Sequence, residues 1–305
     1  MSIQYTDIKS SEQWHSLRRG VIGASETGAL FGVHDYLSYW TLYQKKRGML
    51  PETADDGAME RGRRLEPVAL DMLRDRYPEW GVHAPKKHYA EHEFGVGATP
   101  DAFATDPVRG GGLLQIKSVA PSAFRQNWRG DSDAVQPPLW IALQAMQEAW
   151  LTGARWAAVV ALVVDHEIDL HVIEVPVRPD VIEKIKDAAL TFWKRVLEGR
   201  EPEPDYGRDG EAIRKVLRED DGGEIDLSAD NEIYGLVAQR ATVKALVAEY
   251  EYEAKAIDAQ LLHKLGNAAV GRFNGGTISA KTIHRAAYQV KASQYRQLRV
   301  TRSAP

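Results

Sequence analysis

Residues 113–118 form an apolar segment with polar residues at alternate positions, and this alternation constrains the fold more than any other feature of the chain. Successive side chains of a β-strand point to opposite faces. We therefore expect Leu114 and Ile116 to enter a hydrophobic core. Gln115 and Lys117 should then point together from the other face of the strand.

A carboxylate precedes this strand in the sequence. Asp101 follows Thr99 and Pro100 at the end of a short predicted strand. An acid, an oxygen ligand and a lysine that converge would hold a divalent metal ion and activate water for phosphodiester hydrolysis. Glu66, beside the apolar stripe of a predicted helix, could reach the same Mg²⁺ or Mn²⁺ ion. Lys117 would stabilise the charge that develops on the phosphate or position the attacking water.

Arg18 and Ser25 form a second candidate cluster. Residues 20–26 are typical of a turn, and Ser25 is placed to N-cap a short helix that runs to Leu30. A free helix N-terminus, a hydroxyl and a guanidinium group could together bind a terminal phosphate, and Thr99 could add a second hydroxyl. The alternative is a surface arginine beside an ordinary helix cap.

Two further residues have two interpretations each. Gln144 lies on an otherwise apolar predicted helix, so it is either a satisfied core amide or a hydrogen-bond donor to the metal site and DNA. Trp128, between Arg125 and Arg129, could stack on DNA, although packing is the more common role of a tryptophan.

Helices and strands follow one another in mixed order, which predicts an α/β or α+β core. We expect helices at residues 11–19, 65–77, 139–151 and 179–197, and strands at 88–90, 94–98, 113–118, 157–164 and 168–175. Residues 201–205 contain two prolines and three acids and should stay extended and solvated. The sequence thus predicts a core at 1–200, a linker at 201–228 and a C-terminal region at 229–305.

The C-terminal region combines a heptad pattern with a basic tail. Residues 229–265 predict a long helix, whose apolar heptad positions are Leu236, Val243, Tyr250 and Ile257, with Val247, Ala254 and Leu261 in the second position. The helix could support oligomerisation or pack on its own domain. Residues 272–305 contain no acid, and β character appears at 277–283 and 287–290. This tail could grip DNA, or it could dock on the acidic linker of a neighbouring copy.

Composition narrows the class of protein. The chain has no cysteine, which excludes disulfides, iron–sulfur clusters and thiolate zinc sites. A net charge of −4 means that DNA binding must depend on a local basic groove. No segment has the length and hydrophobicity of a membrane span, and the N-terminus lacks the pattern of a secretory signal, so we expect a cytoplasmic protein without a membrane.

Several motifs follow one another in order over residues 10–200. They are residues 14–26 (WHSLRRGVIGASE), 61–67 (RGRRLEP), 99–101 (TPD) and 114–117 (LQIK), followed by Gln144 and Trp150. Together they resemble the motifs of the YqaJ-type viral recombinases, the phage lambda exonuclease family within the PD-(D/E)XK nuclease superfamily. Several ordered motifs are more specific than any of them alone.

The resemblance implies a PD-(D/E)XK core, with a mixed central sheet flanked by helices, followed by a long helix and a small β module. It implies a Mg²⁺- or Mn²⁺-dependent exonuclease that digests the 5′ strand of linear double-stranded DNA with a 5′-phosphate. The resulting 3′ overhangs would serve a single-strand annealing protein. It also implies a homo-oligomeric ring, often a trimer.

The resemblance assigns roles to residues as well. Glu66, Asp101, Gln115 and the backbone carbonyl of Ile116 would be the metal ligands, with Lys117 as the catalytic lysine. Arg18, Ser25 and Thr99 would hold the 5′-phosphate, with Gln144 nearby on the helix that follows.

Gln115 departs from the family pattern, which has glutamate at this position. An amide carbonyl can coordinate a metal ion but brings no charge and cannot act as a base. The glutamine could be a natural variant, a substitution that traps DNA uncleaved, or a sign of lost catalysis; we favour variant metal binding at a real nuclease site. The alternatives are a catalytically silent DNA-end-binding protein that recruits an annealing protein, and a sequence-specific restriction endonuclease.

Overall fold

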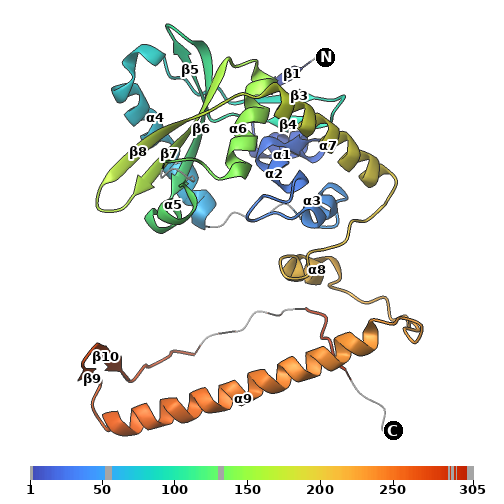
Figure 1. Cartoon of the computed structure of the whole chain (residues 1–305), viewed down its shortest axis with the longest axis vertical. Coiled ribbons are helices and arrows are strands. Elements are labelled where there is room, and N and C mark those ends of the chain that lie inside the picture. Colours follow the sequence, from blue (N-terminus) through green and yellow to red (C-terminus); the bar gives the residue numbers. More distant parts are fainter. Residues whose placement is uncertain are drawn as a thin grey trace. The chain divides into compact units, whose positions relative to one another are not determined.

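The computed structural model describes residues 3–51, 57–129, 134–287, 289, 292 and 294–300. The chain divides into two compact units, Met1–Val216 and Leu217–Pro305. Figure 1 shows the helices and strands of both. Within the described part of the chain, none of the helices combines the length and hydrophobicity that crossing a membrane requires.

The first unit is a mixed α/β fold, as predicted, and its larger sheet carries the motif strand. The strand order is β5-β6-β7-β8, with bounds Ala102–Asp106, Gly110–Val119, Trp156–Val164 and Ile168–Val175. β6 and β7 are parallel, whereas the outer two pairs are antiparallel. A parallel pair needs a crossover connection, and here the connection contains α5 (Pro121–Asn127) and α6 (Leu139–Thr152).

A second sheet has the order β1-β3-β4-β2, with bounds Gln4–Asp7, Lys87–Glu91, Val96–Ala98 and Ile22–Gly23. The remaining helices of this unit are α1 (Ser11–Arg19), η1 (Ala24–Glu26), α2 (Thr27–Leu30), α3 (Tyr39–Lys46), α4 (Gly57–Arg76), η2 (Pro78–Trp80), α7 (Pro179–Leu197) and α8 (Gly210–Val216). The strands expected between residues 88 and 118 therefore belong to two sheets. β5, which the sequence analysis did not predict, is the edge strand of the larger sheet, to which β6 also belongs.

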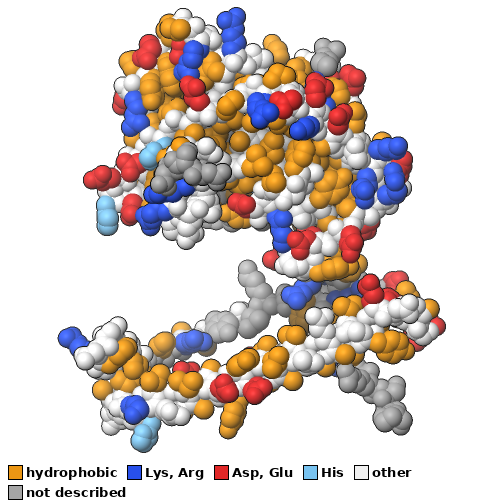
Figure 2. All heavy atoms as spheres, in the orientation of Figure 1, with side chains coloured by type: hydrophobic (Ala, Val, Ile, Leu, Met, Phe, Trp, Pro, Cys, Tyr) orange, Lys and Arg blue, Asp and Glu red, His pale blue; other side chains and the backbone are white. Residues whose placement is uncertain are grey.

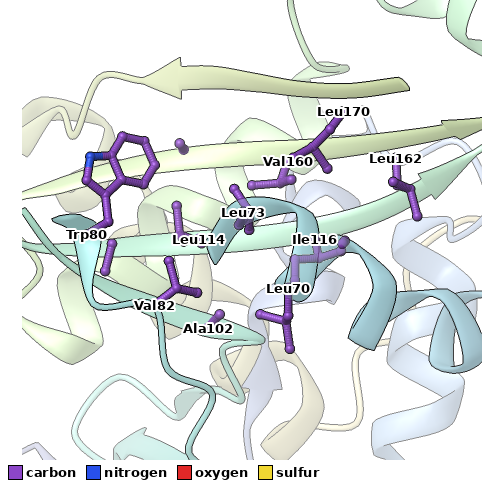
Figure 3. Close-up of a cluster of buried hydrophobic side chains, with 13 residues drawn as sticks. Leu70, Leu73, Trp80, Val82, Ala102, Leu114, Ile116, Val160, Leu162 and Leu170 are labelled. Atoms are coloured by element: carbon purple, nitrogen blue, oxygen red, sulfur yellow. The ribbon is translucent and has the colours of Figure 1, made fainter. Parts of the chain in front are cut away.

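The alternation of β6 decides which helix covers which face. Leu114 and Ile116 pack with Leu70 and Leu73 of α4 in one hydrophobic cluster, shown in Figure 3. Leu113 belongs to a different cluster, together with apolar residues of α6. The predicted core positions of the motif strand are thus confirmed, and the odd-numbered residues face α6. Full burial of one leucine side chain contributes about 1.5–3 kcal/mol.

Two local predictions about helix starts were wrong. α4 begins at Gly57 rather than at residue 65, so Glu66 and Pro67 lie in the helix interior. Pro67 has no N–H to donate to the preceding turn, but packing of the apolar α4 face against the sheet holds the helix across it. Ser25 does not cap α2; it lies inside the short 3₁₀ helix η1.

The acidic segment after α7, residues 201–205, contains no helix or strand, and its three acids are exposed, as predicted. Glu201 accepts hydrogen bonds from Trp40 Nε1 at 2.7 Å and from Gln44 Nε2 at 2.9 Å, both on α3. Further along, buried Asp209 accepts a hydrogen bond from Ser38 Oγ at 2.5 Å. Glu201 and Asp209 thus anchor this part of the chain to α3 and its N-cap Ser38, and the first unit continues to Val216.

The second unit contains the predicted long helix and a small β module. α9 spans Ile233–Leu265, and β9 (Val270–Phe273) pairs with β10 (Gly276–Ser279) as an antiparallel hairpin. The strands were predicted at 277–283 and 287–290, whereas the structure has them at 270–273 and 276–279. Tyr288 and Val290 lie outside the described residues. Gly275, at φ +121°, supplies the turn conformation. The heptad side chains of α9 are exposed except for half-buried Leu261, and Figure 2 shows hydrophobic side chains along the helix.

Candidate active site

Asp101, at the start of β5, is held by the motif strand β6. Its Oδ2 atom accepts a hydrogen bond from the backbone N–H of Ile116 at 2.8 Å and one from Gln115 Nε2 at 2.5 Å. Glu66 on α4 is close enough for its charge to raise the pKa of Asp101. The structure therefore brings the four predicted metal ligands, which come from three separate elements, to one place.

Lys117 joins the same place through α6. Its Nζ donates to Gln144 Oε1 at 2.9 Å, and Gln144 Nε2 donates to Glu148 Oε1, also at 2.9 Å. The ammonium also lies 5.6 Å from the ring centre of Trp140. Sequence reasoning missed Glu148, although its position four residues after Gln144 on a helix was a usable signal.

Burial dominates the electrostatics of this cluster. It raises the pKa of Asp101 to about 7, opposed by the charge of Lys117 and reinforced by that of Glu66. It raises the pKa of Glu148 to about 8, with Asp101 adding to the effect and the hydrogen bond from Gln144 and the charge of Lys117 opposing it. Burial also lowers the pKa of Lys117. Burial makes ionisation of these carboxyl groups costly, and a bound cation would offset this cost because its charge stabilises the carboxylates.

The donor set suits a hard divalent ion, because every candidate ligand offers oxygen. Gln115 Oε1 is buried and has no hydrogen-bond partner. Rotation of this amide would exchange Nε2 for Oε1 beside Asp101, and the unpartnered oxygen would then face the cation. Among the residues that the structure describes, no group of three or more His, Asp or Glu side chains is arranged to hold a metal ion. Glu66 and Asp101 could supply the negative charge for such an ion, and Gln115 and the Ile116 carbonyl could supply neutral ligands.

The second predicted cluster is also assembled. Arg18 Nη2 donates to Ser25 Oγ at 3.2 Å, and the guanidinium lies 4.5 Å from the ring centre of Trp14. Trp14 Nε1 in turn donates to Thr99 Oγ1 at 3.2 Å, and His88 Nδ1 lies 3.1 Å from the same oxygen. Burial, with the nearby charge of Arg18, lowers the pKa of His88 to about 4, so the ring is neutral. No sequence signal connected His88, on β3, to this cluster.

The expected helix N-terminus is not available for a phosphate here. The backbone N–H of Gly23 already donates to Glu26 Oε2 at 2.8 Å. Burial opposes ionisation of Glu26, but the charges of Lys46 and Arg18 hold its pKa below the usual range. Lys46 also donates to the backbone carbonyl of Arg18 at 3.2 Å. The cluster thus consists of the Arg18 guanidinium, the Ser25 hydroxyl on a turn that the buried Lys46–Glu26 ion pair fixes, and the Thr99 hydroxyl.

Trp128 is a packing residue. It is buried in the α6-side core, and its ring centre lies 5.7 Å from that of Phe124. This burial confirms the packing interpretation, because a tryptophan with almost no exposed surface cannot stack on DNA.

Comparison with known proteins relates this assembly to one protein family over part of the chain. Residues 13–155, which include every predicted site residue, match the family model described as the YqaJ-like viral recombinase domain. No curated protein matches the sequence. Among solved structures, the chain is similar to an alkaline exonuclease from Laribacter hongkongensis, with 20% identity, a TM-score of 0.48 and coverage of 67% of this chain and 99% of that one. It is also similar to a phage-related exonuclease from Haemophilus somnus, with 10% identity, a TM-score of 0.41 and coverage of 64% and 91%. The chain therefore contains a YqaJ-like viral recombinase domain over residues 13–155.

Proposed function

We propose that this chain is a metal-dependent exonuclease that digests the 5′ strand of linear double-stranded DNA and leaves 3′ single-stranded overhangs for recombination by annealing. The recombinase domain supports a nuclease-type function. The observation that carries the proposal is the convergence of Asp101, Gln115 and Lys117, with Glu66 beside them.

The proposed metal ligands are Glu66, Asp101, Gln115 and the carbonyl of Ile116. A bound Mg²⁺ or Mn²⁺ ion would polarise the scissile phosphate and lower the pKa of a bound water molecule. Lys117 would stabilise the charge on the phosphate, because its ammonium is held by a hydrogen bond to Gln144.

The Arg18 cluster would determine that digestion starts at the 5′ end of a strand. Arg18 and Ser25 present a guanidinium and a hydroxyl together, and Thr99 adds a hydroxyl on the same side through Trp14. Such groups would bind the terminal 5′-phosphate. Recognition of a terminal phosphate would make the enzyme dependent on a DNA end.

Gln115 makes the proposed metal site weaker than the family pattern. With an amide at this position the site has one negative charge fewer, so the affinity for a divalent ion falls. The amide must also release its hydrogen bond to Asp101 before its oxygen can face the metal.

The test is digestion of a 5′-phosphorylated linear duplex with Mg²⁺ or Mn²⁺ by the unaltered chain, Gln115→Glu and Lys117→Ala. Lys184→Ala, which removes an exposed lysine on α7, is the matched control. We expect the unaltered chain to degrade the 5′ strand, Gln115→Glu to need less metal, and Lys117→Ala to be inactive. Activity in Gln115→Glu alone would mean a nuclease disabled at one position.

A catalytically silent protein that binds DNA ends is the second candidate, and Gln115 favours it. Binding of DNA ends without cleavage by any variant would support this candidate and refute the exonuclease. Cleavage of closed circular DNA would instead indicate a restriction-type endonuclease.

The proposal extends to the partners of the protein. A ring-shaped homo-oligomer, with a trimer favoured, would enclose the duplex, and a single-strand annealing protein would receive the overhang in the cytoplasm of a bacterial host. The exposed heptad positions of α9 support self-association. Light scattering of the full chain would test the oligomer, and a monomer at micromolar concentration would contradict it.

A further inference from the structure

The loop between α2 and α3 is fixed at several points. The backbone N–H of Tyr36 donates to His34 Nδ1 at 3.0 Å, so Nδ1 carries no proton. The proton must then be on Nε2, which lies 3.0 Å from the carbonyl of Ser25 and donates to it. Burial lowers the pKa of His34, which favours this neutral form. Asp35 Oδ2 accepts a hydrogen bond from Trp140 Nε1 at 3.1 Å, and Leu37 is buried.

This fixed loop displays an aromatic ring to solvent. Tyr36 is 83% exposed, yet its ring contacts two others edge-on. The ring centres are 6.2 Å apart for Tyr36 and Trp140 and 6.3 Å apart for Tyr36 and His34. His34 and Trp140 themselves lie 4.5 Å apart, at an interplanar angle of 31°. These contacts orient the Tyr36 ring, and most of its surface remains open to solvent.

The aromatic group connects the two clusters of the candidate active site. His34 is bonded to Ser25, the residue that accepts the hydrogen bond from Arg18. At the other end, Trp140 lies next to the ammonium of Lys117. A Cβ atom on Gly28 would come within 2.5 Å of Trp140 Cβ, so glycine permits this close approach of α2 and α6.

We propose that Tyr36, oriented by His34 and Trp140, is a stacking site for one nucleobase of the DNA strand whose phosphates are bound at Arg18 and Lys117. The inference rests on the DNA substrate of the proposed function and adds a contact to a base. An exposed aromatic ring that is linked through His34 to the Arg18 cluster and through Trp140 to Lys117 suits a polyanion with flat apolar bases. Because every base has such a face, the contact would be independent of sequence.

The experiment measures the affinity of the full chain for a fluorescent, 5′-phosphorylated duplex in EDTA, where cleavage cannot proceed. Four proteins are compared: the unaltered chain, Tyr36→Ala, Tyr36→Phe and Tyr5→Ala. Tyr5 is an exposed tyrosine on β1 and serves as the matched control. Each protein is titrated with natural DNA and with duplexes that carry one abasic nucleotide at the first, second or third position of the 5′ strand.

We expect Tyr36→Ala to bind natural DNA about 5- to 150-fold more weakly, the range that corresponds to one stacked base. Tyr36→Phe and Tyr5→Ala should bind like the unaltered chain. One abasic position should weaken the unaltered chain by a similar factor and have no further effect on Tyr36→Ala. This non-additivity separates stacking from a structural role of the ring, which would weaken binding to every duplex alike.

Equal affinity of Tyr36→Ala and the unaltered chain for natural DNA would overturn the inference while leaving the nuclease proposal intact. Additive losses at every abasic position would also overturn it. Failure of the unaltered chain to bind any DNA end would instead overturn the nuclease proposal, together with this inference.

Discussion

Replacement of Glu148 by glutamine tests the electrostatics of the candidate active site. The side chain is 1% exposed, and its Oε2 atom is buried without a hydrogen-bond partner. Burial raises the pKa of this carboxyl to about 8, and the charge of Asp101 adds to the effect. Glutamine keeps a carbonyl that can accept the hydrogen bond from Gln144 but cannot ionise.

The magnitude follows from the pKa difference between the folded and unfolded states. Glu148 has a pKa of 4.5 in the unfolded chain and about 8 in the folded protein. Between these values the folded protein keeps a proton that the unfolded chain has lost, so stability falls by about 1.4 kcal/mol per pH unit as the pH rises. The full loss approaches ~5 kcal/mol above pH 8. Neighbouring groups ionise in the same pH range and share this effect. We therefore expect Glu148→Gln to recover about 2–4 kcal/mol of the lost stability.

The assay is urea unfolding of the full chain in EDTA at pH 5.0, 6.5 and 8.5. The glutamine adds a buried amide N–H, whose cost does not depend on pH, so the informative quantity is the change in the free-energy difference between the two proteins. As the pH rises, the free energy of unfolding of Glu148→Gln should increase relative to that of the unaltered chain. Glu79→Gln, at an exposed position on η2, should show no such change. Parallel stability curves for Glu148→Gln and the unaltered chain would refute the reasoning.

Three further predictions concern the phosphate pocket, the core and the second unit. Arg18→Ala should reduce the preference for a 5′-phosphate over a 5′-hydroxyl by about 10- to 100-fold, measured as the ratio of the two digestion rates; an unchanged ratio would remove Arg18 from the pocket. Leu162→Ala, at a fully buried position of β7, should lower the free energy of unfolding by about 2–5 kcal/mol in urea titration, whereas a loss below 1 kcal/mol would contradict the packing. A chain that ends at Val216 should stay folded but retain DNA more weakly, with a smaller salt dependence, and equal affinity and processivity would refute a DNA role for the tail.

The place of the truncation shows why the structure was needed for its design. A chain that ends after Gly207, where the sequence suggested a linker, would lose Asp209 and its hydrogen bonds to Ser38 and Thr41. Local composition predicted the exposed acids of residues 201–205 correctly, but it did not indicate where the first unit ends. That end depends on where α3 packs, because Ser38 and Thr41 donate hydrogen bonds to Asp209, and local composition does not encode this packing.

Local periodicity was sufficient for the elements and for part of the site. Alternation along β6 placed Leu114 and Ile116 in the core and set Gln115 and Lys117 on the other face, because the strand period relates neighbouring side chains directly. The uninterrupted helical pattern likewise predicted α9. The ordered motifs predicted which residues the fold brings together, because residues of one motif keep a fixed spacing within one helix or strand.

Tertiary packing decided the groups that surround those residues. Helical spacing alone pairs Glu148 with Gln144, but the burial of α6 against the sheet removes the carboxyl from solvent. His88 reaches Thr99, and Trp140 reaches Lys117, across segments that are distant in sequence. The sequence by itself predicted which residues meet in the candidate active site, through local spacing and residue type. Their neighbours, their burial and hence their pKa values were decided by long-range packing, because these depend on the three-dimensional environment and not on the adjacent residues.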